Sequence, residues 1–196
     1  IDLRYYKGLH KNVITDLFGG QYYVDSYNRK SVLAENSVNG GVTSWVNQKL
    51  GVGDVIRRDY DGFVMYEGGF AQLEYNKDKV SAFVSGGLTN TSYWRKDRFY
   101  YSGDKQLSSK KHYLGGNVKA GLNYNLDDYN NVFFNTGCIS RAPIFDNTFI
   151  NSQSSHERNP DAKNEKVYSF ELGYGYRSSW LNVNLNAYYT RWMDKT

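Results

Sequence analysis

Apolar and polar residues alternate at every second position over most of the chain beyond residue 62. The segment 166–177 shows this most clearly, because its even positions are mostly aromatic or aliphatic and its odd positions are mostly small or polar. The even positions from 168 to 176 are Tyr168, Phe170, Leu172, Tyr174 and Tyr176. A helix would spread these side chains around its circumference, whereas a strand places them on one face. The pattern therefore predicts a β-strand.

The same alternation predicts six main strands, each antiparallel to its neighbours in the sequence. They cover residues 62–76, 79–93, 112–126, 131–141, 165–177 and 180–193, to within about two to four residues at each end. In the last of them the odd positions are apolar: Leu181, Val183, Leu185, Ala187 and Tyr189. Paired strands present their apolar residues to the same medium, so this odd set and the even set of 165–177 are expected on one face.

The links between these strands alternate in length. Those at 76–78, 127–130 and 177–179 are short and polar, as tight hairpins require, whereas those at 94–111 and 141–164 are long. Outer-membrane barrels combine short turns on one side with long extracellular loops on the other. We therefore predict an all-β fold, an antiparallel up-and-down meander that forms a partial transmembrane β-barrel of about six to eight strands. The alternative is a soluble sandwich, in which loop lengths are more mixed.

Residues 1–61 follow a different pattern. Alternation is poor there, and Asn, Gly, Ser and Asp are frequent, as in the segment 36–41. Short strands are conceivable at 22–24 and 42–46. We predict that residues 1–61 form a large extracellular loop region and that residues 62–196 form the barrel strands and their loops.

Composition excludes several classes of protein. The chain has 24 Lys and Arg against 20 Asp and Glu, and the formal net charge of +4 is too small to argue for nucleic acid as a partner. A single cysteine, Cys138, excludes an intrachain disulfide framework. No run of ~18 apolar residues predicts a transmembrane helix. The mean hydropathy of −0.69 is compatible with a soluble protein and equally with a barrel.

No group of residues has the spacing of a catalytic or metal site. His10, His112 and His156 each lack a second ligand nearby in the sequence, so each is expected at the surface, with His156 solvated. Cys138 falls on the apolar side of a predicted strand, which favours an inert thiol. No Ser or Cys has a base and an orienting partner, and no glycine-rich phosphate loop follows a strand. We therefore predict that the protein is not an enzyme and holds no cofactor and no metal.

Aromatic residues gather near the predicted strand ends. One group fits the interfacial girdles of a barrel, where a ring with a polar tip suits the headgroup boundary: Tyr75, Tyr124, Tyr174, Tyr176, Tyr189 and Trp192. A second group, at the rim of a long loop, consists of Tyr93, Trp94, Tyr100 and Tyr101. These four residues are candidate ligand contacts, although packing of the loop on its own aromatic side chains is the simpler explanation. Arg141 ends a strand and is a further candidate, with pairing to an acidic neighbour as the alternative.

The stretch 134–196 resembles the barrel of TonB-dependent outer-membrane receptors, in particular those of Bacteroidetes-type bacteria. The matching features are Ser140-Arg141-Ala142-Pro143, the segment 159–165 that begins Asn159-Pro160 and ends at Glu165, Glu171-Leu172-Gly173, and Tyr188-Tyr189 followed by Asp194. Residues 60–95 also look like an inner portion of such a barrel. Each short motif is weakly specific, and their order and spacing carry the resemblance.

The resemblance implies a receptor in the cell outer membrane that imports a scarce nutrient of the siderophore, cobalamin or oligosaccharide class. Its partners would be outer-membrane lipid, the nutrient, and TonB, which contacts a plug domain and a TonB box that this sequence lacks. A whole receptor has about 22 strands, so the chain is expected to be a fragment of the barrel region. Two alternatives are a soluble all-β surface module that binds ligands as lectins do, and a small barrel complete in itself.

The predicted sheet has consequences for the isolated chain. A sheet taken from a barrel has two unpaired edges and an apolar face that lipid would otherwise cover. Both features favour association between copies. We therefore expect the isolated chain to self-associate or to need detergent.

Overall fold

The computed structural model describes residues 1–24 and 48–195. Nine strands and two short 3-10 turns occur in this part of the chain. The strands are β1 (Asp2–Val13), β2 (Tyr22–Val24), β3 (Gln48–Leu50), β4 (Val55–Lys77), β5 (Val80–Asp97), β6 (Lys111–Asn125), β7 (Asn130–Arg141), β8 (Glu165–Arg177) and β9 (Asn182–Met193). The 3-10 turns are η1 (Gly103–Gln106) and η2 (Phe145–Thr148). No helix in the described residues is long and apolar enough to span a membrane.

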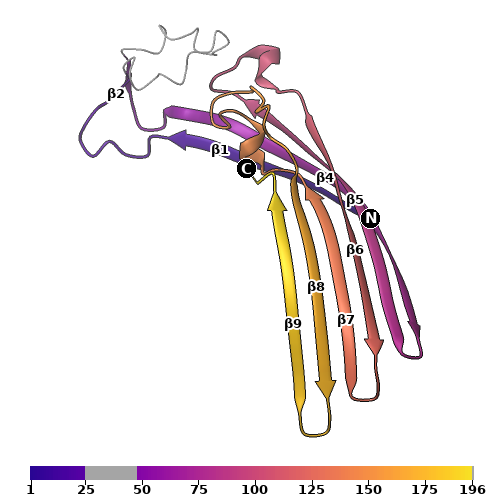
Figure 1. The fold of residues 1–196 in the computed structure, drawn as a ribbon. Coiled ribbons are helices and arrows are strands. Elements are labelled where there is room, and N and C mark those ends of the chain that lie inside the picture. The colour runs from indigo at the N-terminus through magenta and orange to yellow at the C-terminus, as the bar shows by residue number, and fades with distance from the viewer. Residues whose placement is uncertain (25–47, 196) are drawn as a thin grey trace.

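Seven of the strands form one antiparallel sheet in the order β1-β4-β5-β6-β7-β8-β9 (Figure 1). From β4 to β9 each strand pairs with the next one along the chain, as an up-and-down meander requires. Strands β1 and β9 are the two edges, so the sheet formed by the described residues does not close. The short strands β2 and β3 pair separately with each other. The predicted all-β meander is confirmed.

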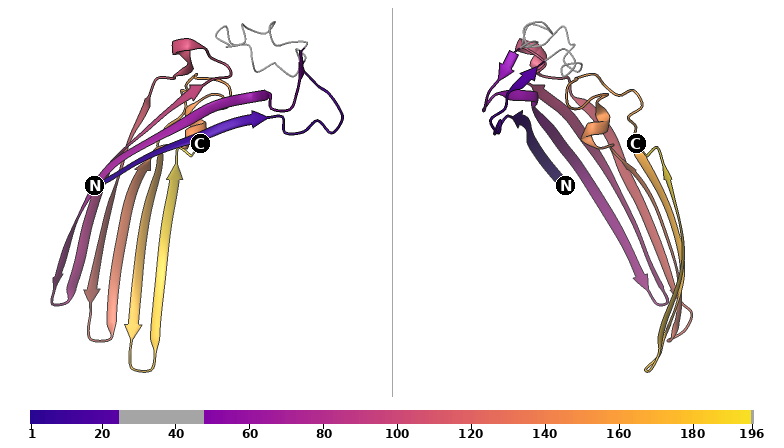
Figure 2. Two further views of the ribbon diagram at one scale, coloured as in Figure 1. Left: turned by 180° about the vertical axis from the view of Figure 1, so that it is seen from behind. Right: turned by 90° about the vertical axis from the view of Figure 1, so that its left-hand side faces the viewer.

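All six strands expected from the alternation occur, and the two earliest are longer than expected. Strand β4 has 23 residues and β5 has 18, whereas about 9–11 suffice to cross a membrane as a tilted strand. The three short turns lie together at one end of the sheet, and the long connections lie at the other (Figure 2). We call these the turn end and the loop end. In the turn between β6 and β7, Asp127 accepts hydrogen bonds from the backbone N–H groups of Tyr129 and Asn130, both at 2.8 Å.

The structure corrects the expectation for residues 1–61 in two places. Residues 2–13 are not a loop but the edge strand β1, which pairs with β4 over its whole length, and β4 already begins at Val55. The alternation of β1 is hidden because Lys7 interrupts the series Leu3, Tyr5 and Leu9 on one face. This strand forms because it pairs with residues far away in the chain, from Val13 with Val55 to Asp2 with Gly68, and local sequence does not show such pairing.

Two further segments of that region complete the comparison. The short strand considered at 22–24 is observed as β2. The segments 36–41 and 42–46 lie outside the described residues. The division of the chain into an extracellular region and a barrel region stays a prediction.

Side chains of the sheet separate into two faces. The register places Leu185 opposite Tyr174 and Ala187 opposite Leu172, so the even set of β8 and the odd set of β9 share one face, as predicted. We call this side the apolar face; its members include Leu73, Leu88, Leu122, Phe134, Leu172 and Leu185. The opposite side, the polar face, includes Gln72, Ser85, Lys119, Asn135, Glu171 and Asn186. Leu88, Leu172 and Leu185 are 70%, 61% and 64% exposed, so the described residues leave the apolar face uncovered.

Candidate functional site at the loop end of the polar face

The connection between β7 and β8, residues 142–164, packs against the polar face at the loop end. The Tyr93 hydroxyl of β5 donates a hydrogen bond to the Pro143 carbonyl oxygen at 2.8 Å, and the Tyr93 ring lies 5.7 Å from the ring of Phe145. Tyr93, Tyr113 and Phe149 are buried as a result. Most of the buried side chains of the described residues lie at this end, whereas the rest of the sheet has both faces open.

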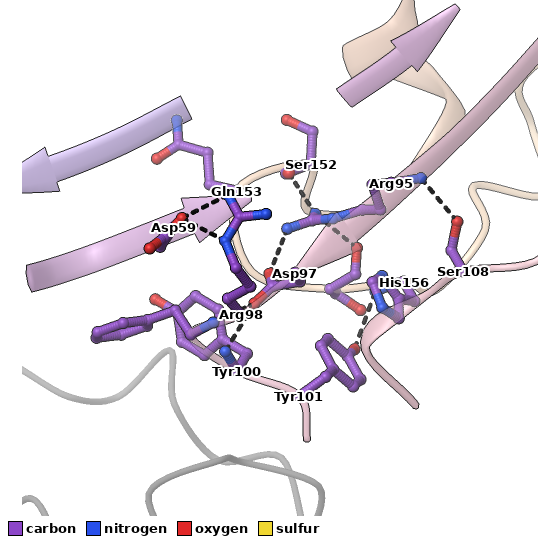
Figure 3. Close-up of polar contacts among 12 residues, drawn as sticks. Asp59, Arg95, Asp97, Arg98, Tyr100, Tyr101, Ser108, Ser152, Gln153 and His156 are labelled. Carbon is purple, nitrogen blue, oxygen red and sulfur yellow. Dashed lines mark hydrogen bonds and ion pairs between the residues drawn. The ribbon is translucent and has the colours of Figure 1, made fainter. Parts of the chain in front are cut away.

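Arg95 of β5 fixes this connection to the sheet (Figure 3). Its guanidinium group is fully buried and forms a salt bridge to Asp97 at 2.6 Å. It also donates hydrogen bonds to the backbone carbonyl oxygens of Ser155, at 2.9 Å, and Ser152. The guanidinium carbon lies 4.1 Å from the centre of the Tyr60 ring. Hydrogen bonds donated by a charged guanidinium group are stronger than neutral ones. The two that Arg95 donates to Ser152 and Ser155 therefore hold the connection against the sheet.

Asp97 holds the other long connection, residues 98–110 between β5 and β6, against the sheet. Its carboxylate accepts hydrogen bonds from the backbone N–H groups of Phe99 at 2.8 Å and Tyr100 at 2.7 Å. The Tyr100 hydroxyl in turn donates to the carbonyl oxygen of Arg57 in β4. The ion pair of Arg95 and Asp97 therefore links both long connections to one strand.

His156 joins the two long connections to each other. Its ring stacks on the ring of Tyr101 with a centroid distance of 3.9 Å, and its backbone N–H donates to the Tyr101 hydroxyl oxygen at 2.9 Å. The ring atom Nε2 lies 3.1 Å from the carbonyl oxygens of Lys105 and Gln106. Carbonyl oxygens only accept hydrogen bonds, so Nε2 carries the proton. His156 was expected to be solvated, and the structure places it in a partly buried stack instead.

We expect the packing of these connections to weaken below neutral pH. Burial, together with the charges of Arg95 and Arg158, lowers the pKa of His156 from 6.5 to about 4. When the connections open, His156 regains its ordinary pKa, so the open form binds more protons between these two values. The free energy that favours the packed form over the open form is therefore greatest above pH 6.5. It decreases by as much as about 3 kcal/mol as the pH falls to 4.

Hydrogen–deuterium exchange of residues 145–158, corrected for its intrinsic pH dependence, measures this effect. The variant His156→Gln keeps a side-chain N–H donor and does not titrate. Its exchange is expected to depend on pH much less than that of the wild type between pH 7 and 4, and the buried Asp97, whose pKa burial raises, titrates in both proteins. A wild-type protein that behaves like this variant would contradict the assignment.

An exposed charged group lies on the polar face beside this packed region. Arg141, at the end of β7, forms a salt bridge with Glu165 of β8 at 2.6 Å, and its side chain is 59% exposed. The Arg141 guanidinium carbon lies 5.7 Å from the centre of the Trp192 ring, which belongs to β9 and is 53% exposed. Arg141 and Trp192 therefore present a cation and an aromatic ring to solvent on one face, while the Glu165 carboxylate that pairs with Arg141 is buried.

Two open hollows lie on the polar face between the loop end and the turn end. The hollow of about 470 Å³ is lined on this face by Lys119, Asn135, Ser169, Glu171, Tyr188 and Thr190. A neighbouring hollow of about 600 Å³ lies beside Phe83. Within the first, the Glu171 carboxylate accepts hydrogen bonds from the side-chain amides of Asn135, at 3.0 Å, and Asn186, at 3.2 Å.

Glycines shape these hollows. Gly121 pairs with Phe83, and Gly173 pairs with Phe133, across neighbouring strands. A Cβ atom at either glycine would lie well inside van der Waals distance of the partner ring. The absence of a side chain therefore lets each ring lie flat over the sheet, which is a known way to protect a glycine in a strand.

Comparison with known proteins gives one result that decides the family. The family model of the TonB dependent receptor-like β-barrel matches residues 2–195. The chain belongs to this family. No curated protein matches the chain. The proteins of this family are outer-membrane receptors and transporters rather than enzymes, which supports a role of this kind for the chain.

The five predicted ligand contacts do not lie together in the structure of this receptor-family chain. Tyr93 and Tyr100 are buried, and both hydroxyl groups are bonded to backbone carbonyl oxygens. Tyr101 stacks on a histidine, as described above. Trp94 lies on the opposite side of the sheet, where its ring stacks on Phe63 at 5.1 Å. Arg141 alone of the five combines high exposure with a place on the polar face, and ligand contact at these positions stays a prediction.

The positions matched to the receptor family stabilise the connection after β7. Pro143 is buried, and its carbonyl oxygen accepts the hydrogen bond from Tyr93. The side-chain amide of Asn159 donates to the carbonyl oxygen of Asn147 at 3.0 Å, whereas the adjacent Pro160 is exposed. Glu165 pairs with Arg141. The matched positions therefore hold the loop in place.

Sequence reasoning did not single out Arg95, Asp97 or Glu171 as functional residues, and Glu171 entered it only within the Glu171-Leu172-Gly173 feature that resembles the receptor family. Arg95 and Asp97 are two positions apart in a strand, so they point to the same face, directly after Tyr93 on that face. A pair of opposite charges in such a segment is a usable signal. No local pattern indicates the hydrogen bonds of Glu171, because its partners Asn135 and Asn186 come from two other strands. In the described part of the chain, no group of three or more His, Cys, Asp and Glu side chains could hold a metal ion.

Proposed function

We propose that this chain forms part of the wall of a TonB-dependent transporter that imports a scarce nutrient across the outer membrane. The apolar face contacts lipid, and the polar face lines the interior. The nutrient belongs to the siderophore, cobalamin or oligosaccharide class, and the receptor is of the Bacteroidetes type. TonB acts through a plug domain and a TonB box, which belong to other parts of the receptor.

One observation carries this proposal, namely the difference between the two faces of a sheet that runs from short turns to long connections. A soluble module would cover large apolar side chains, yet the leucines of the apolar face are mostly exposed. A barrel wall needs an outward apolar band and a polar interior. The open hollows around Glu171 and Asn135 provide hydrogen-bonding groups for a domain that fills the barrel.

The ligand site of the proposal is the exposed group around Arg141 at the loop end. A nutrient that enters from outside meets this end first. An arginine that is already oriented by Glu165 can bind a carboxylate, phosphate or hydroxyl group of a ligand, and the adjacent Trp192 ring offers a surface for stacking.

We expect Arg141→Ala to weaken nutrient uptake by the complete receptor in cells. The half-saturating concentration is expected to rise at least about tenfold, because hydrogen bonds to a charged group are worth about 1.5–3 kcal/mol. Uptake of a labelled panel of siderophores, cobalamin and oligosaccharides, with and without a functional TonB, measures it. Arg177→Ala is the matched control, since Arg177 lies on the polar face at the turn end. Uptake that does not need TonB would contradict the proposed function itself, whereas equal effects of the two variants would contradict only the site.

The isolated chain is expected to self-associate in the absence of detergent. Its edges β1 and β9 each present unpaired backbone groups, and the apolar face is a large exposed hydrophobic surface that favours association. Sedimentation in detergent-free buffer measures this directly. A 22.6 kDa monomer at all concentrations that binds no hydrophobic dye would contradict the expectation.

A further inference from the structure

Arg158, in the connection between β7 and β8, has a guanidinium group that lies near the start of β6. Its carbon atom Cζ lies 4.8 Å from the centre of the ring of Phe149, with which Arg158 forms a β-bridge. Its atom Nη2 donates hydrogen bonds to the Ser109 carbonyl oxygen and, at 3.2 Å, to the Ser109 hydroxyl oxygen. The other terminal nitrogen, Nη1, is buried and has no hydrogen-bond partner among the described residues.

A second buried donor without a partner lies close to Arg158. Tyr113 of β6 is 6% exposed, and its hydroxyl group forms no hydrogen bond with the described part of the chain. The two side chains are near enough to interact electrostatically. The Lys111 ammonium group lies 5.6 Å from the centre of the Tyr113 ring, on the same face of β6. Buried polar groups in folded proteins nearly always have a hydrogen-bond partner, so two such donors side by side indicate a shared acceptor.

The charge around these donors is positive and has no counter-charge. Arg158 and Lys111 form no ion pair with the described residues, and the buried Asp97 is already paired with Arg95. Glu157 is next to Arg158 in the sequence, but it is exposed. Burial lowers the pKa of Arg158, because a cation is less stable away from water. A partly buried guanidinium group of this kind is stabilised by an anion.

The bonding of Arg158 indicates what kind of anion fits. Carboxylates and phosphates typically bind arginine through two parallel N–H···O bonds, which come from Nη2 together with either Nε or Nη1. Nη2 of Arg158 carries two protons, and the two oxygen atoms of Ser109 accept them. Nη1 therefore binds an acceptor on its own. A single-atom anion needs no second parallel bond, so this geometry favours chloride over a carboxylate or a phosphate.

We propose that a chloride ion binds between the connection 142–164 and β6, where it accepts hydrogen bonds from Arg158 Nη1 and the Tyr113 hydroxyl group and faces the Lys111 ammonium group. Lys111 is exposed, so the ion reaches the site from solvent on this side. The bound ion links the connection to β6, whereas the contacts of Arg95 link it to β5. The inference does not depend on which nutrient the receptor transports.

The test measures hydrogen–deuterium exchange of residues 145–158 in the complete receptor purified in detergent. Sodium chloride replaces sodium gluconate at constant ionic strength and at a fixed pH above 7, where His156 stays neutral. An ion that binds only the packed form lowers the population of the open form by the factor 1 + [Cl⁻]/Kd. Exchange is therefore expected to slow about tenfold when the chloride concentration is about ten times Kd.

Three variants connect this effect to the site. Arg158→Gln removes the cation, keeps an N–H donor for Ser109, and is expected to lose the dependence on chloride. Tyr113→Phe keeps the ring in place and is expected to raise the half-saturating chloride concentration at least about tenfold, because it removes a hydrogen bond to a charged group. The matched control Arg177→Gln removes an arginine from the polar face at the turn end, and its response to chloride is expected to equal that of the wild type.

Crystals of the wild-type receptor soaked in bromide, which replaces chloride, give a second measurement that does not depend on how the variants fold. An anomalous peak in contact with Arg158 Nη1 and the Tyr113 hydroxyl group is expected, and the absence of a peak there would overturn the proposal. Wild-type exchange that does not respond to chloride would also overturn it. An unchanged response in Arg158→Gln would show a general salt effect instead. Equal protection by acetate or inorganic phosphate would show that the site does not select a single-atom anion.

Discussion

Leu172→Arg is expected to block assembly of the receptor in the outer membrane. Leu172 is the middle residue of the outward series 168–176 of β8, lies between Phe134 and Ala187 of the neighbouring strands, and is 61% exposed. An arginine on the lipid-facing side near the bilayer midplane costs about 2–4 kcal/mol. The free energy of unfolding in lipid vesicles and the fraction of receptor recovered in the outer membrane measure the loss.

The matched control is Asn186→Arg, at the same height on the other face. Asn186 pairs with Gly173, next to Leu172 in the sequence, and its amide donates to Glu171. An arginine there stays in the polar interior and can take over the contact with this carboxylate. The control is expected to assemble as well as the wild type. Equal damage by the two substitutions would mean that the two faces do not meet different media.

Arg95→Ala is expected to release both long connections from the sheet. The substitution removes the contacts to Ser152 and Ser155 and leaves the Asp97 carboxylate buried without its cation. Removing one partner of a buried pair typically costs about 3–5 kcal/mol. The strands between the turn end and the middle of the sheet make no contact with this pair. Faster hydrogen–deuterium exchange and proteolysis are therefore expected in residues 98–110 and 142–164 only.

Two further variants separate this effect from a general loss of charge. Arg4→Ala breaks an ion pair whose arginine is 75% exposed, and such exposed pairs contribute little to stability. The double variant Arg95→Ala/Asp97→Asn removes the stranded charge and keeps an acceptor for the N–H groups of Phe99 and Tyr100. It is expected to recover part of the stability that Arg95→Ala loses. A double variant no better than Arg95→Ala would show that the buried charge is not the cause.

Arg141 and the ion pair of Arg95 and Asp97 lie on the same face of the sheet but differ in exposure. Arg141 is exposed at the end of β7, where we propose that a ligand binds, whereas Arg95 and Asp97 are fully buried beneath the two long connections. Uptake and loop exchange are therefore expected to respond to different substitutions.

The sequence by itself determined the strands from β4 to β9, their antiparallel order and the assignment of their faces. Each of these features depends on the period-two alternation within one strand and on short polar turns, which are local properties. The alternation of β8 and β9 showed that Tyr174 and Leu185 share a face before any pairing was known. The confirmed register adds only the partner of each residue.

Tertiary structure decided what depends on contacts between distant residues. Strand β1 exists as an edge because Gly8 pairs with Gly62, and its own interrupted alternation is too weak to reveal it. Arg95 becomes a structural centre because it reaches Ser152, 57 positions further along the chain. Burial of Tyr93 and Tyr100 likewise depends on how the two long connections fold back over the sheet. A side chain's pattern in the sequence fixes its face, but only the folded chain determines whether another segment covers that face.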